Sequence, residues 1–311
     1  MREECPYDFP PYRPPNEAAS ALIRITKGCP WNKCMFCFMY KSIPFKMKSL
    51  NEALKDIQRA RQIYRDKEAI FLGDSDNLVH QDLPAIVASI RETFPEAKRI
   101  TAYARAKTLV RKKMEFLVAV RRAGLNRLHI GLESGDAIVL ERIRKGASPE
   151  EMVEAGRKAK KAGFEVSFYV LSGAGGKDRW KEHTMNSAAV LNEIGPDFIR
   201  LRTLTLQPGT SLQEKKIRGE FTITPPLERI NEVKLFVEKL KVSNCYLASD
   251  HLTNYLWADK RIIYRGVAGI LPDEKLAILN TLNRVISFIE STEMEIKDSN
   301  QLYEEGYITA L

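Results

Sequence analysis

The chain has 311 residues, of which 44% are hydrophobic and 29% are charged, with a net charge of +9. This composition is typical of a globular chain with a sizeable core, enough for one α/β barrel or two smaller domains, and it excludes a disordered chain. No apolar run approaches the roughly 20 residues that cross a bilayer. The start, MREECPYDF, has no basic or apolar signal region, so we expect a cytoplasmic protein.

The positive charge is concentrated in residues 98–161, which contain 17 Lys or Arg and 7 Asp or Glu. A basic surface of this kind attracts nucleic acid or an anionic substrate. The alternative is that these side chains only solvate the outer faces of helices.

The chain begins with a proline-rich stretch, CPYDFPPYRPPNEAAS, which has five prolines in 16 residues. Proline restricts its own backbone and that of the residue before it, so we expect residues 1–20 to form an extended arm.

From residue 21 onward, short apolar runs alternate with amphipathic helical patterns. Gly124, Gly163 and Gly195 end three of these helices. Six strands alternating with helices indicate a parallel sheet with right-handed crossovers. The predicted strands are Ile23–Thr26, Ala69–Gly73, Arg99–Ala104, Arg127–Glu133, Glu165–Leu171 and Phe198–Leu204.

Polar residues alternate with apolar ones along several of these strands. Arg200 and Arg202 share one face of their strand, as do Thr101 and Tyr103, and Ser167 and Tyr169. A doubly wound sheet is apolar on both faces, so we expect a partial (β/α)6 barrel of the TIM type with a polar lumen. The alternative is a set of polar core groups that pair internally.

Beyond residue 206 the pattern is less regular. We expect a helix over Pro226–Lys241, a strand at Cys245–Ala248 and a helix over Asp273–Glu290. The predicted organisation is thus an arm (1–20), a barrel (21–212) and a short C-terminal α/β extension that closes it (213–311).

Three of the five cysteines, Cys29, Cys34 and Cys37, fall within nine residues, directly after the first strand. Loops there lie at the active face of α/β barrels. Thiolates bind zinc and iron–sulfur clusters. A 2Fe–2S ferredoxin site or a structural zinc site needs a fourth ligand, for which Cys245 or Cys5 is the candidate. The third reading is an accidental cluster of thiols that binds no metal. The fourth is a 4Fe–4S cluster with three protein ligands and one open iron.

With these motifs the sequence resembles the radical S-adenosylmethionine (SAM) superfamily over Ala21–Leu212, although the first cysteine gap is x4 rather than x3. The resemblance implies that Phe36 contacts the cofactor. It also implies that Gly73, Asp74 and Ser75, in FLGDSDN, take the place of a GGE-like motif that binds the amino group of SAM.

The stretch IGLESGDAIVLERIRKG resembles relatives of oxygen-independent coproporphyrinogen oxidases, methylthiotransferases and the Elongator catalytic subunit. It implies that Glu133 and Ser134 face the ribose or methionine of SAM. Lys160, with Arg157 as a fallback, would bind the methionine carboxylate, and Gly173 would approach the adenine.

The resemblance implies that a reduced cluster cleaves SAM to a 5′-deoxyadenosyl radical, which takes a hydrogen atom from an unidentified substrate. The electron would come from a flavodoxin or ferredoxin. Tyr103, Glu133, Arg200, Arg202 and His251 are the candidate catalytic residues. Arg200 and Arg202 can hold an anionic substrate, or pair with Glu133.

His251 can transfer a proton, or it lies at a helix start capped by Ser249 or Asp250. Cys245 is a hydrogen donor, a methyl acceptor or a buried thiol. The rival functions are a zinc-stabilised RNA-binding protein and a non-catalytic relative that binds SAM or haem.

Overall fold

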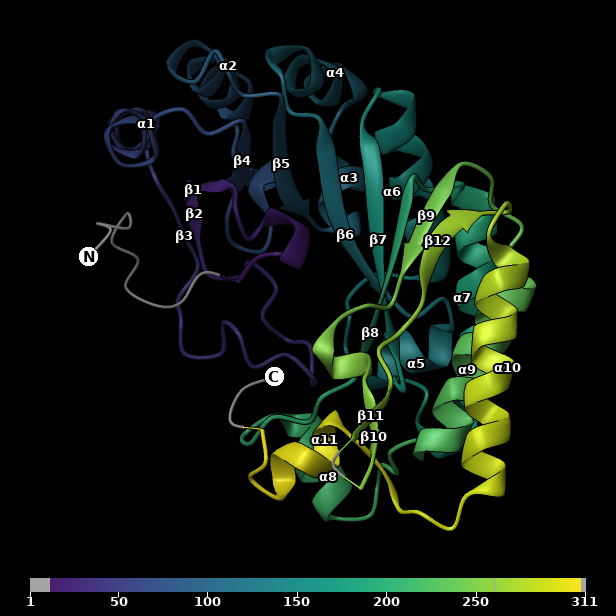
Figure 1. Cartoon of the computed structure of the whole chain (residues 1–311). Helices are drawn as coiled ribbons and strands as arrows, with labels where there is room; N and C mark the ends of the chain where they lie inside the picture. Colours follow the sequence, from purple (N-terminus) through teal and green to yellow (C-terminus); the bar gives the residue numbers. More distant parts are fainter. Residues whose placement is uncertain (1–11, 260, 309–311) are drawn as a thin grey trace. The chain divides into compact units, whose positions relative to one another are not determined.

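The computed structural model describes residues 12–259 and 261–308 (Figure 1). Most of the expected arm, with Cys5, lies outside these residues. Where the arm is described, a 3-10 helix, η1 (Pro15–Glu17), interrupts the extended conformation that the prolines predict.

The chain divides into two compact units, which we describe separately. The first comprises the described residues up to Asn32, with Met39–Ile130 and Glu154–Val166, and the second comprises Lys33–Phe38, Gly131–Val153 and Ser167–Leu311. The predicted boundaries after Ser20 and Leu212 stay predictions.

In the first unit, parallel strands run in the order β1-β4-β5-β6. Helix α2 packs between α1 and α4 along one side of these strands (Figure 1). A separate antiparallel ribbon joins β2 to β3. The elements are β1 (Ala21–Ile23), β2 (Thr26–Lys27), β3 (Lys46–Met47), α1 (Leu50–Tyr64), β4 (Ala69–Leu72), η2 (Asn77–Val79), α2 (Leu83–Thr93), β5 (Arg99–Ala104), α3 (Ala106–Arg111), α4 (Met114–Ala123), β6 (Arg127–Glu133, ending in the second unit) and α6 (Pro149–Lys161, beginning there).

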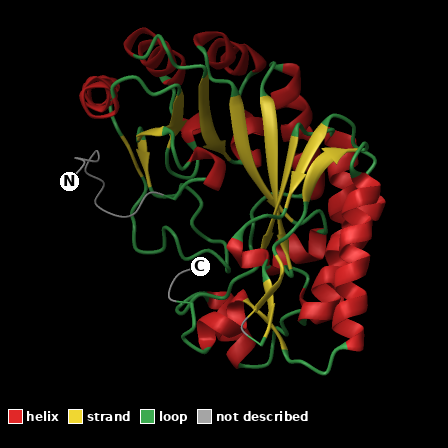
Figure 2. Ribbon diagram, viewed as in Figure 1, coloured by secondary structure: helices red, strands yellow, loops and turns green. Residues whose placement is uncertain are grey.

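In the second unit, β7, β8 and β9 are parallel and β12 joins β9 antiparallel. Helix α9 packs between α7 and α10, as the long red helices of Figure 2 show. A second sheet has the order β11-β10-β13. The elements are α5 (Ala137–Arg142), β7 (Glu165–Ser172, beginning in the first unit), α7 (Gly176–Ile194), β8 (Phe198–Thr203), α8 (Ser211–Ile217), α9 (Pro226–Lys239), β9 (Cys245–Ala248), η3 (Leu252–Asn254), β10 (Leu256–Ala258), β11 (Arg261–Tyr264), β12 (Ala268–Leu271), α10 (Lys275–Ser291), β13 (Ile296–Asp298) and α11 (Ser299–Glu304).

The predicted α/β class with a mostly parallel sheet is confirmed. β1 is an edge strand in the first unit and β12 in the second, so the described strands form an open, partial barrel. Gly124 and Gly195 end α4 and α7 with positive φ, as expected for glycine caps.

The first predicted strand, Ile23–Thr26, is wrong in extent. The chain leaves the β4 ladder after Ile23, where Gly73 N donates to Ile23 O at 2.9 Å. Thr26 then pairs with Met47 in the β2–β3 ribbon. Arg24, between the two strands, forms an ion pair with Asp74 instead of continuing the strand.

The strand faces alternate as the sequence predicts. In β7 and β8, Tyr169 is in register with Arg200 on one face, while Phe168 is in register with Ile199 on the other. Phe168 and Ile199 are fully buried apolar residues. The polar residues therefore gather on one side of the parallel strands.

η1 brings a carboxylate into the first unit. Glu17 is fully buried, and its carboxylate accepts from Ser20 Oγ (2.6 Å) and Arg99 Nη2 (3.0 Å) and lies 3.4 Å from His129 Nε2. Burial by itself raises the pKa of Glu17, but the hydrogen bonds from His129 and Ser20 and the charge of Arg99 outweigh it and lower the pKa to about 2.

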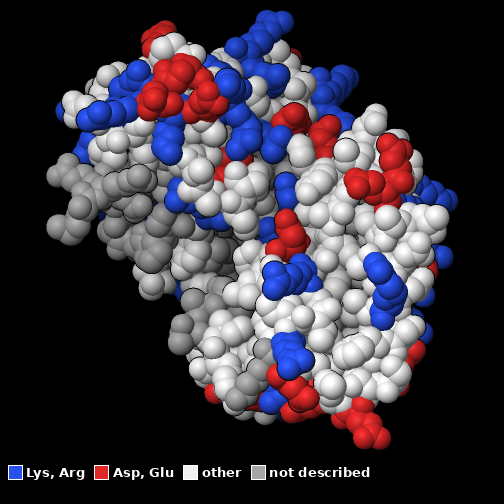
Figure 3. All heavy atoms as spheres, in the orientation of Figure 1, with Lys and Arg blue, Asp and Glu red and all other residues white. Residues whose placement is uncertain are grey.

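Some of the basic side chains of residues 98–161 hold elements together. Arg121 Nε donates to Gly163 O at 2.7 Å, and Lys158 Nζ to Val110 O at 2.7 Å. Over α1, α2 and α4, Figure 3 shows basic and acidic side chains mixed rather than one positive field. Among the described residues, no helix combines the length and apolarity that a bilayer crossing requires.

Candidate functional site

The cysteine loop begins directly after β2. Gly28 has φ +80°, and a Cβ there would lie 3.0 Å from Ile43 O, so the position requires glycine. The backbone N–H of Asn32 donates to Cys29 Sγ at 3.4 Å. Asn32 itself is left-handed (φ 48°), and its side chain donates to Tyr40 O at 2.6 Å. The turn thus aims an amide at the sulfur of Cys29.

In the second unit, Cys34 and Cys37 flank a backbone anchor. Met35 N donates to Ile143 O at 2.9 Å, and Met35 O accepts from Leu212 N at 3.0 Å. The Met35 side chain is buried in an apolar cluster with Leu212. The two cysteines therefore lie on either side of a fixed point of the chain.

The donor set fits an iron–sulfur cluster. Cys29, Cys34 and Cys37 are reduced, half-buried thiols, and thiolates are the ligands that such clusters require. An amide directed at Cys29 Sγ is a contact that tunes bound clusters. Among the described residues, no three Cys, His, Asp or Glu side chains lie close enough together to bind one metal ion. The assignment of these three ligands stays a prediction.

Phe36 lies beside an apolar surface in the second unit. It packs with Leu171 against the buried side chains of Val139, Ile143 and Ala174. Gly173, the predicted adenine neighbour, immediately precedes Ala174 and has φ +86°. Gly173 is thus next in the chain to the apolar cluster that Phe36 packs against. The contacts of both residues with SAM stay predictions.

The loop after β4 carries Gly73, Asp74 and Ser75 in the first unit. Ser75 Oγ donates to Gly28 O at 2.9 Å, so this loop is tied to the residue before Cys29. Asp74 is 3% exposed, has φ +66°, and lies 3.3 Å from Arg24 Nε. The carboxylate predicted to meet the SAM amino group is therefore paired with an arginine of this chain.

Glu133 also has a partner that the sequence did not indicate. Its Oε1 lies 2.8 Å from Lys145 Nζ, and both side chains are 15% exposed. Glu133 has φ +63° at the end of β6. The alternative expectation paired Glu133 with Arg200 or Arg202, whereas the ion pair that Glu133 forms is with Lys145.

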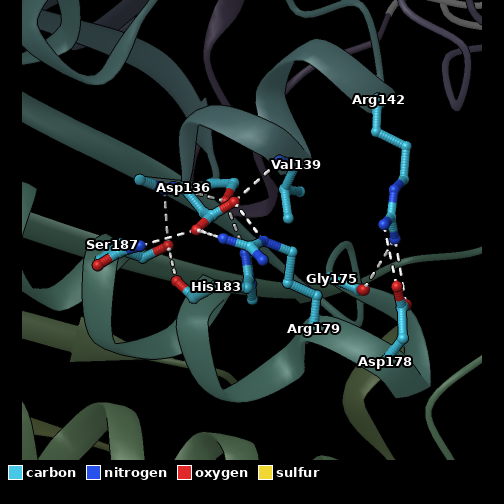
Figure 4. Close-up of polar contacts among 11 residues, drawn as sticks. Asp136, Val139, Arg142, Gly175, Asp178, Arg179, His183 and Ser187 are labelled. Carbon is cyan, nitrogen blue, oxygen red and sulfur yellow. Dashed lines mark hydrogen bonds and ion pairs between the residues drawn. The ribbon is translucent and has the colours of Figure 1, made fainter.

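A network that sequence reasoning missed connects the loop after β6 to helix α7 (Figure 4). Asp136 accepts two bonds from Arg179 (2.9 and 3.0 Å), one from Asn186 (2.7 Å) and one from Val139 N (3.0 Å). Burial by itself raises the pKa of Asp136, but these hydrogen bonds outweigh it and lower the pKa to about 2. Asp136 is therefore a charged N-cap of α5 and a fixed anchor for α7.

A second missed network runs through His183 on α7. His183 Nδ1 lies 2.8 Å from Ser134 Oγ, and His183 Nε2 lies 3.4 Å from Glu232 Oε1. Glu232, on α9, also accepts from Gly173 N at 2.9 Å. His183 and Glu232 therefore connect the two loops that carry the predicted SAM contacts Ser134 and Gly173.

Arg157 and Lys160 lie on α6 in the first unit, where both are exposed. They occupy the polar side of that helix, while Met152 and Ala159 face the core. Their predicted contact with the methionine carboxylate stays a prediction.

Tyr103 belongs to an aromatic group on the polar side of the first unit's strands. The centroid of its ring lies 5.1 Å from that of Phe71 and 6.0 Å from that of His129, and both pairs are arranged edge to face. This packing fixes the ring plane of the candidate catalytic tyrosine.

Arg200 and Arg202 lie on one face of β8 in the second unit. The Arg200 guanidinium is 5.3 Å from the Tyr246 ring, and that of Arg202 is 5.6 Å from the Tyr169 ring. Arg200 is 9% exposed, and its Nε has no hydrogen-bond partner in the described part of the chain. Ser167 Oγ, on the neighbouring β7, is likewise buried and unsatisfied there. Buried polar atoms normally have partners, so this face has donors for a ligand.

His251 caps η3. Its Nδ1 accepts from Thr253 N at 3.2 Å, so the helix start expected here is present but His251, not Ser249 or Asp250, is the cap. Burial, followed by the charge of Arg202, lowers the pKa of His251 to about 4, so the imidazole is neutral at pH 7. Its catalytic role stays a prediction.

Cys245 is fully buried in β9, as expected if it is a buried thiol.

Comparison with known proteins identifies one family. The model for the radical SAM superfamily matches residues 23–188. The uncharacterized methyltransferase PH0819 of Pyrococcus horikoshii is 26% identical over 209 residues, which cover 65% of this chain and 43% of that protein. The heme chaperone HemW of Buchnera aphidicola is 22% identical over 201 residues, covering 61% of this chain and 52% of its own.

Among solved structures, methylornithine synthase (PylB) superposes with a TM-score of 0.51 at 18% identity, covering 90% of this chain and 74% of that one. This likeness shows the fold alone. The chain spans only about half the length of the two curated relatives above.

Proposed function

Because the chain belongs to the radical SAM superfamily, we propose that Cys29, Cys34 and Cys37 bind a 4Fe–4S cluster and that the protein cleaves SAM reductively. The observation that carries the proposal is the cysteine loop: three reduced, half-buried thiols in nine residues, with an amide at Cys29 Sγ. Three protein ligands would leave one iron of such a cluster available to SAM. We also propose a cytoplasmic location, because clustered cysteines that bind a metal suit a reducing compartment.

A cluster held by these three cysteines would supply one electron for the cleavage of SAM into methionine and a 5′-deoxyadenosyl radical, and that radical would abstract hydrogen from the substrate. The residues of this chain bind and orient the cofactor. Phe36 and Gly173 would contact the adenine, and Ser134 the ribose or methionine. His183 and Glu232 hold the loops of Ser134 and Gly173 in place. Loops that are already fixed lose less conformational entropy when SAM binds.

We propose that the substrate is anionic and contacts Arg200, with Arg202 beside it. The support is a buried guanidinium whose Nε lacks a partner among the residues described. A carboxylate or phosphate accepts two parallel N–H bonds from such a group. The similarity to an uncharacterized methyltransferase makes methyl transfer a candidate outcome beside oxidation.

The test is an anaerobic preparation analysed for metal, sulfide and SAM cleavage. We expect about four irons and four sulfides per chain and 5′-deoxyadenosine after addition of dithionite and SAM. Cys34→Ala should abolish the product. Cys245→Ala is the matched control, because that thiol is buried in β9, and it should retain both cluster and product. One zinc per chain without iron, or product from Cys34→Ala, contradicts the proposal.

The similarity to the heme chaperone HemW favours a second candidate, a non-catalytic protein that binds SAM or haem. The same preparation separates the two. Iron and sulfide without 5′-deoxyadenosine, together with stoichiometric haem binding in a spectral titration, indicate the chaperone.

A further inference from the structure

A cavity of about 150 Å³ lies in the C-terminal part of the second unit, outside the residues that match the family. Residues of β10, of β13 and of the segment around α11 line it. Trp257 and Lys297 are direct cross-strand partners in the β10–β13 pair, so their side chains share one face of the sheet. A cavity of this size holds a molecule about as large as benzene.

The apolar part of the lining is mainly aromatic. Trp257 is 9% exposed, and the centroid of its ring lies 6.0 Å from that of Tyr255. Leu302, on α11, is buried. Tyr307 is exposed, and its backbone N–H donates to Leu302 O at 2.8 Å. The cavity therefore offers a ligand two aromatic rings, one buried and one open to solvent.

The charged part of the lining is mainly negative. Asp259, Glu295 and Glu305 supply three carboxylates, against one ammonium group from Lys297. Lys297 Nζ lies 2.8 Å from Glu305 Oε1 and 3.2 Å from Glu295 Oε2. The hydrogen bond with Glu305 raises the pKa of Lys297, so this amine is protonated at neutral pH. Asp259 forms no ion pair with the residues that the structure describes. The lining thus has an excess of negative charge, and its cation is already bonded to two carboxylates.

This lining favours one class of ligand over two others. Among the described residues, no three carboxylates lie close enough together to bind one metal ion. An anion would be repelled by the three carboxylates, and Lys297 is already engaged with two of them. A protonated amine, in contrast, is attracted both by carboxylates and by the faces of aromatic rings.

We propose that this cavity binds an alkylammonium group, either of a small molecule or of a lysine side chain. The apolar stem would contact Trp257 and Leu302, and the ammonium group would lie near Asp259 and the Tyr307 ring. The volume limits the bound part to about six non-hydrogen atoms. The inference does not depend on the proposed function, because every lining residue lies beyond residues 23–188.

The experiment titrates the full chain with n-butylammonium chloride by calorimetry. 1-Butanol and butyrate are the control ligands, because they have a similar stem without the positive charge. The variant D259N/E295Q removes two exposed carboxylates of the lining. Its matched control, D273N/E293Q, makes the same changes at two exposed carboxylates outside the lining. Urea unfolding verifies that both variants keep the stability of the unchanged protein.

We expect one equivalent of n-butylammonium to bind, and 1-butanol and butyrate to bind more weakly. D259N/E295Q should lower the affinity about tenfold, since an exposed carboxylate near a cation contributes about threefold. Added salt should lower the affinity of the unchanged protein. D273N/E293Q should bind like the unchanged protein.

The exposed ring of Tyr307 provides a second pair of variants. Tyr307→Leu removes the aromatic face and should weaken n-butylammonium binding about threefold, within the range of exposed cation–π contacts. Tyr307→Phe keeps the ring and should retain most of the affinity.

A lysine blocked at both ends, Nα-acetyl-lysine N-methylamide, distinguishes the two sources of the amine. If it binds more tightly than n-butylammonium, the natural ligand is a polypeptide, and if it binds more weakly, the ligand is a small molecule. Three results overturn the proposal. Neither amine binds saturably, or 1-butanol binds as tightly as n-butylammonium, or D259N/E295Q and D273N/E293Q change the affinity equally.

Discussion

His183 Nε2 and Glu232 Oε1 lie 3.4 Å apart, and their side chains are 1% and 4% exposed. One residue comes from α7 and the other from α9. Through Ser134 Oγ and Gly173 N, this pair joins two loops that are predicted to contact SAM.

Replacing Glu232 tests whether this pair positions the loops. Glu232→Ala leaves Gly173 N without its acceptor, which costs about 1–3 kcal/mol of unfolding free energy. We expect the dissociation constant of SAM to rise as well, measured by equilibrium dialysis. Glu232→Gln keeps an acceptor for Gly173 N and should restore most of the SAM affinity. A purely structural role predicts lower stability with unchanged SAM affinity.

Asp76 gives a pH prediction. It is fully buried, accepts from Thr108 Oγ1 at 2.5 Å, and burial raises its pKa from 3.8 to about 6. A raised folded-state pKa means that the protonated form stabilises the fold. The contribution of this carboxyl group to the free energy of unfolding is complete below about pH 3.8 and is lost as the pH rises through about 6.

Asp76→Asn should remove this dependence, because the amide carries no charge. We expect the variant to gain up to about 3 kcal/mol over the unchanged protein between pH 4 and pH 8. Urea unfolding at several pH values measures the difference. A difference that does not vary with pH contradicts the assigned shift.

Arg200 and Arg229 form a matched pair of buried arginines. Arg229 is paired with Asp298, whereas Arg200 has aromatic neighbours and no carboxylate within the described residues. Breaking a buried ion pair costs about 3–5 kcal/mol, while replacing an uncompensated buried charge by an apolar side chain costs little.

We therefore expect Arg229→Met to lower the unfolding free energy by several kcal/mol, and Arg200→Met to leave it unchanged or raise it. Thermal and urea unfolding measure both. Equal destabilisation by the two substitutions indicates that Arg200 has a structural partner and argues against a ligand role.

Asn32 tests the turn that presents Cys29. Its left-handed backbone suits Asn and Gly but strains a β-branched residue by about 1–2 kcal/mol. Asn32→Gly keeps the turn and its amide, so we expect nearly full iron content after reconstitution. Asn32→Val should shift the turn and bind less iron. Equal iron and sulfide in both variants shows that the amide contact at Cys29 Sγ is dispensable.

Much of the fold could be predicted from local sequence. β5, β6 and β9 have the predicted boundaries because short apolar runs mark them, and Gly124 ends the helix before β6. The first strand was misplaced because the alternation of IRIT continues past the point where Arg24 turns to Asp74. Pairing with β4, which stops at Ile23, determines where the first strand ends.

The site was predicted less completely. The cysteines and the glycine-containing loops carry local motifs, whereas His183 and Glu232 sit within helices whose spacing gives no functional signal. Lys145 is 12 residues from Glu133, and only the fold brings them together. Such contacts are set by packing, which one sequence does not reveal.

The buried Glu17 shows that the packed first unit begins before the part of the chain that matches the family. The family match begins at residue 23, yet Arg99 and His129 depend on a carboxylate six residues earlier. A chain shortened to start at residue 23 would leave these two side chains without that anion. Boundaries chosen from homology alone would therefore cut into the core of the first unit.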